Sequence, residues 1–170
     1  TEGQGTRRLS EAATAFAAAN PPTPDVPFPD RYTGVFLERR RECAWQLYEC
    51  VGVEKGDRAA SAVEAMRNYT FFGAPHVAII TTEQDLGTYG AVDCGVYVGC
   101  FLLAAQSLGL ATIPQAALGA VAPAIRELYE LPPERQVLMG ISFGYPDTAH
   151  PANGFRTRRA DLSDVVTRAA

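Results

Sequence analysis

Two runs of consecutive apolar residues limit the fold more than any other feature of the sequence. They cover residues 75–82 (PHVAIITT) and 136–143 (QVLMGISF). A strand with one face in water alternates polar and apolar residues, whereas a continuous apolar run is typical of a strand buried on both faces. A shorter third strand is predicted over residues 110–114. Other elements must therefore cover both faces of a small sheet.

Segments with helical periodicity provide that cover. The predicted helices span residues 7–19, 36–51 and 91–108, with shorter ones after the capping residue Asp57 and from Pro123. Residues 91–108 are apolar almost all round, so we expect this helix to be buried either in the core or in a large subunit interface. Prolines predict an extended connection over residues 20–30. These elements predict a single α+β or α/β domain, residues 1–170, with a small central sheet flanked by helices.

Composition disfavours several classes of protein. The net charge of −4 argues against a general nucleic-acid binder, which needs a concentrated basic surface. No uninterrupted apolar run looks long enough to cross a bilayer, so we expect no membrane partner. The four cysteines form no C-x-x-C pair, and only two histidines are present, so no metal site is expected. Buried free thiols in a reducing cytoplasm are the simplest interpretation of the cysteines.

Familiar catalytic motifs are missing from the sequence. It contains no G-x-S-x-G elbow, no H-E-x-x-H, no phosphate-binding P-loop and no G-x-G-x-x-G. No side chain is therefore assigned a catalytic role. This pattern favours either a bound cofactor that carries out the chemistry or a protein without catalytic activity.

Three segments resemble the C-terminal part of FMN-dependent nitroreductases. They are residues 68–79 (NYTFFGAPHVAI), 103–115 (LAAQSLGLATIPQ) and 140–159, which begins GISFGYPD and ends FRTRR. Their order and spacing match the family, and the similarity extends over residues 30–166. The resemblance implies an α+β nitroreductase-like fold that forms an intertwined homodimer.

The resemblance also implies where FMN would bind. In the family, the turn after Ile-Pro presents backbone groups to the N5 and O4 edge of the flavin, which corresponds to Pro114, Gln115 and Ala116 here. A basic tail binds the FMN phosphate, which corresponds to Arg156 and Arg158. These arginines alternate, so in an extended segment both would point the same way. A plain strand-to-loop turn and a solvated basic loop are the alternatives.

The implied function is ping-pong hydride transfer. NAD(P)H would reduce the flavin at N5, and a nitroaromatic, quinone or similar small-molecule acceptor would then take the electrons. The family's N-terminal motifs, R-x-[ST]-x-R and P-[ST]-x-x-N-x-Q-P-W, do not occur in the sequence. We therefore expect that the chain lacks an N-terminal segment and that these 170 residues alone bind FMN weakly or not at all. A truncated or non-catalytic dimeric scaffold, or a flavin-binding protein of the same fold, is the alternative.

Overall fold

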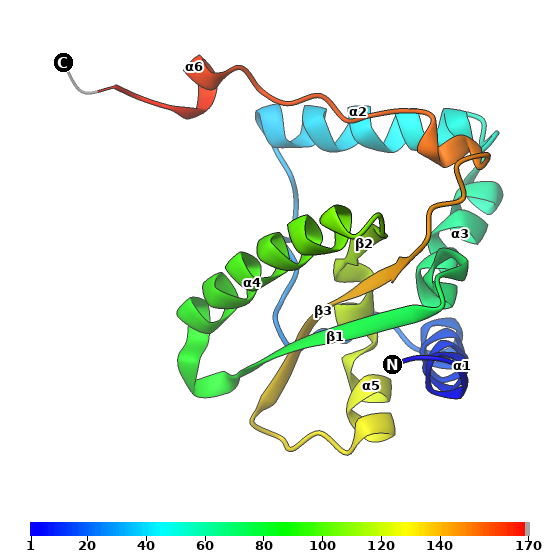
Figure 1. Cartoon of the computed structure of the whole chain (residues 1–170), viewed down its shortest axis with the longest axis vertical. Helices are drawn as coiled ribbons and strands as arrows, with labels where there is room; N and C mark the ends of the chain where they lie inside the picture. The colour runs from blue at the N-terminus through cyan, green and yellow to red at the C-terminus, as the bar shows by residue number, and fades with distance from the viewer. Residues whose placement is uncertain (169–170) are drawn as a thin grey trace. The chain divides into compact units, whose positions relative to one another are not determined.

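The computed structural model describes residues 1–168, which divide into two compact units (Figure 1). The first unit comprises residues 1–30 and 62–146, and the second comprises the remainder. The first unit contains α1 (Gln4–Ala19), η1 (Arg67–Gly73), β1 (His76–Glu83), η2 (Gln84–Leu86), α4 (Gly87–Ser107), β2 (Ala111–Gln115), η3 (Ala116–Val121), α5 (Ala122–Tyr129) and β3 (Arg135–Gly144). The second contains α2 (Gly34–Cys50), η4 (Pro151–Asn153) and α6 (Leu162–Val165), and α3 (Arg58–Met66) crosses the division.

The sheet has the strand order β1-β3-β2, and both pairings are antiparallel. His76 lies opposite Phe143 in the first pairing, and Gln115 lies opposite Gly140 in the second. An irregularity between Ile80 and Thr81 leaves Leu138 of β3 without a partner on β1. All three predicted strands are confirmed, with bounds that differ from the prediction by one residue at most.

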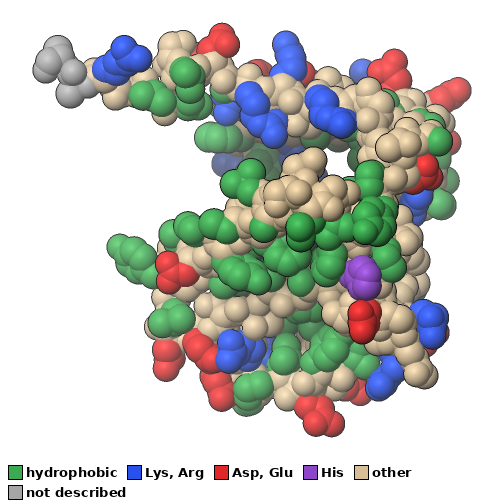
Figure 2. Space-filling view, viewed as in Figure 1, with side chains coloured by type: hydrophobic (Ala, Val, Ile, Leu, Met, Phe, Trp, Pro, Cys, Tyr) green, Lys and Arg blue, Asp and Glu red, His purple; other side chains and the backbone are tan. Residues whose placement is uncertain are grey.

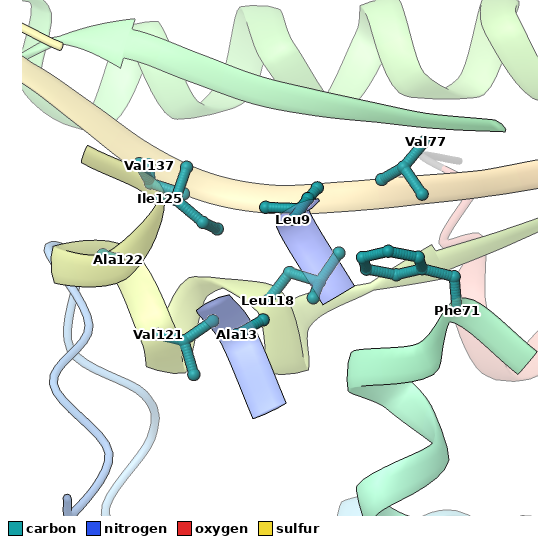
Figure 3. Close-up of a cluster of buried hydrophobic side chains, with 9 residues drawn as sticks. All are labelled: Leu9, Ala13, Phe71, Val77, Leu118, Val121, Ala122, Ile125 and Val137. Carbon is teal, nitrogen blue, oxygen red and sulfur yellow. The ribbon is translucent and has the colours of Figure 1, made fainter. Parts of the chain in front are cut away.

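Both faces of the sheet are covered, as the continuous apolar runs predict. On one face, α1, η1, η3 and α5 enclose a core with β1 and β3 (Figure 3). Its buried members are Leu9, Ala13, Phe71, Val77, Leu118, Val121, Ala122, Ile125 and Val137. On the other face, α4 packs Val98 against Ile80 and Ile141. Adjacent residues of β1 alternate between the two clusters, because successive side chains of a strand point to opposite faces.

Helix α4 is much more exposed in this chain than a core helix would be. Only Gly90, Val98 and Ala105 are buried along it, whereas Leu103 is 76% exposed. Figure 2 shows apolar side chains at the surface along this helix. We expected this helix either in the core or in a subunit interface. One side of α4 packs on the core, and the apolar side chains of its other side are uncovered in this chain.

The same helix corrects one expectation from the sequence. The helical segment Gln84–Ser107 is long and apolar enough to cross a membrane, judged by length and composition alone. Glycine and tyrosine residues and Asp93 interrupt the run and hid this property. Helices of globular proteins pass the same test, so this property alone does not indicate a membrane protein.

Helix α2 dominates the second unit and has no buried residue. Between Pro146 and Arg168, the chain contributes only η4 and the short α6 to this unit. The expectation of buried thiols is wrong for Cys43 of α2 and for Cys100 of α4, which are both exposed. They lie on the outward sides of amphipathic or apolar helices, and the sequence pattern alone did not distinguish those sides.

Candidate functional site

The turn at Pro114–Ala116 is the point where β2 ends and η3 begins. Pro114 and Ala116 are exposed, whereas Gln115 between them is only 3% exposed. Proline is tolerated here because β2 is an edge strand, where a missing N–H group breaks no ladder. The turn therefore lies at the surface, while the side chain of its central residue is buried.

The buried side chain of Gln115 joins two other polar residues, Asn68 and Ser142, in what we call the amide relay. Gln115 Nε2 donates to the backbone oxygen of Asn68 at 2.9 Å and to Asn68 Oδ1 at 3.2 Å. The Ser142 hydroxyl donates to Gln115 Oε1, and Asn68 Nδ2 donates to Ala65 O at 2.9 Å. Both N–H groups and the oxygen of the Gln115 amide thus have partners, as buried polar groups require.

A strained turn follows Asn68 directly. Phe71, Phe72 and Gly73 have φ values of 57°, 52° and 81°. The left-handed region costs a non-glycine residue about 1–2 kcal/mol. Burial of the Phe71 ring in the core offsets this cost, and the ring of Phe72 lies beside the Arg67 guanidinium. Phe71 is therefore a core residue and not a stacking surface for a ligand.

The two predicted phosphate ligands lie in the second unit. Arg156 Nη1 donates to the backbone oxygens of Asn153 and Phe155 at 2.9 and 2.8 Å. Arg158 Nε donates to Glu42 Oε1 of α2 at 2.6 Å. This hydrogen bond lowers the pKa of the Glu42 carboxyl and raises the pKa of the Arg158 guanidinium. The two arginines are both exposed but have different partners, so the structure does not unite them on one acceptor.

A cavity of about 580 Å³ borders the Glu42–Arg158 pair within the second unit. Its lining carries both signs of charge, from Arg39, Glu42, Cys43, Gln46, Thr157, Arg158, Arg159, Ala160, Asp161 and Asp164. The side-chain oxygen of Gln46 is buried without a hydrogen-bond partner. The cavity is therefore polar and electrically mixed rather than a purely cationic pocket.

The turn and the two arginines have the chemical groups that FMN binding requires. The Pro114–Ala116 turn lies at the surface on a support of buried side chains, and its backbone groups suit the edge of a flavin ring. Arg156 and Arg158 each retain guanidinium N–H groups beyond those already engaged, which suits a phosphate. The turn belongs to the first unit, and both arginines belong to the second. Among residues 1–168, no group of three His, Cys, Asp or Glu side chains is placed to hold a metal ion.

Sequence reasoning assigned no role to Asn68, Ser142 or Glu42. A signal was present for Ser142, because a hydroxyl inside a strand buried on both faces must find a partner. No comparable signal marked Asn68 or Glu42. Their partners lie 47 and 116 residues away along the chain, and only the fold brings them together.

Comparisons with known protein families, sequences and structures all find nitroreductases or related reductases. A model of the nitroreductase family matches residues 3–145. Nitroreductase NfnB of Mycolicibacterium smegmatis is 35% identical over 166 residues, which are 96% of this chain and 70% of that protein. A 4-nitrobenzoate reductase of Nocardioides sp. is 34% identical over 142 residues, 83% of this chain and 58% of that protein. The crystal structure of FMN-dependent nitroreductase NfnB from Mycobacterium smegmatis in complex with NADPH has a TM-score of 0.94 and 32% identity, and the match covers 100% of this chain and 77% of that one.

Proposed function

The chain belongs to the nitroreductase family, and on that premise we propose that it is an FMN-dependent oxidoreductase that transfers hydride from NAD(P)H to nitroaromatics or similar small-molecule acceptors. The observation that carries this proposal is the similarity, over nearly the whole chain, to a nitroreductase that is FMN-dependent and binds NADPH. A second relative is named a 4-nitrobenzoate reductase. No specific observation favours the alternative of a non-catalytic scaffold.

The residues of the turn would orient the cofactor. FMN, when bound, supplies a ring whose N5 atom accepts hydride and passes it on. In the proposed arrangement, the backbone at Pro114, Gln115 and Ala116 faces the N5 and O4 edge and fixes the ring by hydrogen bonding. Pro114 limits the freedom of the backbone that leads into the turn. This chain therefore contributes orientation rather than a reacting side chain.

The arginines are candidates for the phosphate of the cofactor. Arg156 and Arg158 are proposed to donate to the FMN phosphate through their remaining N–H groups. Arg158 already donates to Glu42, so a phosphate must share or replace this contact. Arg159 donates to Thr157 instead and serves as a natural control.

The exposed apolar side of α4 supports a homodimer. Tyr89, Val96 and Leu103 are exposed along this helix, and contiguous apolar surface of this kind marks interaction sites. Gly95 and Gly99 have open space where a Cβ atom would lie, which permits close approach of another helix. We further propose that residues 1–170 act as one nitroreductase-like domain and that the protein works in the cytoplasm, where its four free cysteines stay reduced.

A flavin titration and an oxidation assay test the proposal together. The purified chain is titrated with FMN, and NADPH oxidation is then followed with and without 4-nitrobenzoate. Arg156→Ala and Arg158→Ala should each weaken FMN binding by roughly tenfold or more, the effect of losing one charge-assisted hydrogen bond. Arg159→Ala should leave binding near the wild-type value. Because these 170 residues alone are expected to bind FMN weakly, the oxidation assay is run with a large excess of FMN. Absence of acceptor-dependent NADPH oxidation under that condition would refute the proposal.

A further inference from the structure

We propose that the amide relay of Asn68, Gln115 and Ser142 positions the backbone of the Pro114–Ala116 turn for the flavin edge. The inference rests on the proposed function, and the three side chains are positioning residues that would not touch the cofactor. They come from η1, β2 and β3, and all lie in the first unit.

The donors and acceptors of the relay are compatible with only one orientation of the Gln115 amide. Asn68 Nδ2 donates to Ala65 O, so its Oδ1 faces Gln115. If the Gln115 amide turned over, its oxygen would face the two oxygens of Asn68, and its NH₂ group would face the Ser142 hydroxyl. Because two acceptors repel a third, the relay holds Gln115 in one orientation. These hydrogen bonds tie the Gln115 side chain to η1 and β3 and so restrain the position of the end of β2 that carries it.

Leu118 fixes the far side of the same turn. This side chain is fully buried in the core. It lies over Gly140, the residue opposite Gln115 in the sheet, where a Cβ atom would come within 2.3 Å of Leu118 Cδ1. The peptide groups between Gln115 and Leu118 are therefore held between a hydrogen-bonded anchor and a packed anchor. Ala116, an exposed residue, lies between these two anchors.

Stability is one part of what the amide at position 115 contributes. Replacing both partners of a buried hydrogen bond by apolar groups of the same shape is often nearly neutral. Replacing Gln115 and Ser142 by apolar residues would remove the hydrogen bond between them, but it would leave the two Asn68 oxygens without their donor, so the amide contributes to stability as well as to geometry. What the relay adds beyond stability is a single geometry, and it does so beside the strained Phe71–Gly73 turn. Strain of this kind persists only where the surrounding contacts determine the conformation.

Three variants and a control test the relay. Ser142→Ala removes one donor, Gln115→Met removes the amide, and the double variant tests whether they act together. Val137→Ala is the control, because Val137 is equally buried in β3 but belongs to the core at the opposite end of the strand. Two quantities are measured: hydrogen–deuterium exchange of residues 111–121 without flavin, and the dissociation constant of FMN.

Each single relay variant should raise exchange at residues 116–118 and weaken FMN binding by about tenfold, the factor expected for one buried hydrogen bond. The double variant should be no worse than Gln115→Met, because Ser142 then has no amide to orient. Val137→Ala should lower thermal stability without a selective effect on the turn. If Gln115→Met fails to fold, Ser142→Ala carries the same test.

Two outcomes distinguish a failure of the relay hypothesis from a failure of the proposed function. Wild-type exchange and wild-type FMN affinity in Ser142→Ala and Gln115→Met would overturn the relay while leaving the proposed function intact. A wild-type chain that oxidises no NADPH with an acceptor at a large excess of FMN would overturn the proposed function, and one that binds no FMN at that excess would overturn the relay's role toward the flavin. The exchange data would still report whether the relay holds the turn.

Discussion

An ion pair between Asp25 and Arg126 ties the extended proline-rich segment before α2 to the rest of the first unit, and removal of this pair should be costly. Asp25 Oδ2 accepts from Arg126 of α5 and from the backbone N–H of Val137 in β3 at 2.7 Å. Arg126 Nη1 also donates to the backbone oxygens of Pro132 and Arg135 at 3.0 and 2.7 Å. One guanidinium thus connects the segment, the helix and the loop that leads into the central strand.

The expected magnitude follows from burial. The side chains of Arg126 and Asp25 are 26% and 19% exposed. Exposed pairs contribute about 0.2–1 kcal/mol, whereas breaking a buried pair costs about 3–5 kcal/mol. We expect Arg126→Ala to lower the free energy of unfolding by about 2–3 kcal/mol, because Asp25 keeps only the Val137 N–H and two carbonyls lose a donor. Asp25→Asn should cost about 1 kcal/mol, because its side-chain oxygen still accepts from Val137.

Urea unfolding followed by far-UV circular dichroism measures these changes. Trp45 is the only tryptophan in the sequence and belongs to the second unit, so its fluorescence reports that unit separately. Arg135→Ala is the matched control. Its side chain pairs with Glu83 across the sheet, but both side chains are more than a third exposed, so its loss should cost at most about 1 kcal/mol.

A double-mutant cycle between Asp25→Ala and Arg126→Ala isolates the pair itself. We expect a coupling energy of about 1–2 kcal/mol. The reasoning is refuted if Arg126→Ala costs less than about 0.5 kcal/mol, or if the coupling energy is close to zero while both single variants destabilise.

Three further predictions concern single sites. Glu130 ends α5 with a φ of 51°, so Glu130→Gly should stabilise the chain by about 1 kcal/mol in a thermal melt, and a loss of stability would contradict the left-handed cap. Gly140→Ala should destabilise by about 1–3 kcal/mol, because the added methyl meets Leu118; a neutral result in urea unfolding would show that Leu118 can move aside. The pKa of Glu42 is lowered by Arg158, so the contribution of this pair is fully present above the ordinary value of 4.5 and is lost as pH falls below it. An NMR titration with Glu42 at or above its ordinary pKa would exclude the ion pair.

The strands were predictable because burial on both faces leaves a continuous apolar run, which few other structures produce. The start of α4 was not. The predicted helix begins at Ala91, whereas the observed one begins at Gly87 and includes Gly90. Glycine disfavours helices in isolation, but at Gly90 a Cβ atom would come within 2.3 Å of Thr82 Oγ1, so packing against β1 requires it. A contact between distant segments overrode the local preference.

The candidate site was predictable only in part. Resemblance to a family located the Pro114–Ala116 turn, and this position coincides with the junction of β2 and η3. The inward direction of Gln115 follows from strand alternation, but its partners do not, because they come from elements that meet only in the folded sheet. The different partners of Arg156 and Arg158 were equally hidden, since the tail is not the regular strand that the alternation argument assumed.

The sheet order has a consequence for synthesis on the ribosome. The central strand, β3, is the last of the three to be made, and both β1 and β2 pair only with it. Until Gly144 has emerged, the apolar strand β1 and the apolar helix α4 are outside the exit tunnel without the strand that joins them. Nascent chains with unpaired strands and uncovered apolar helices are prone to aggregate. A pause in translation after α4 would therefore expose this protein to chaperones or to misassembly, whereas the same pause after β3 would not.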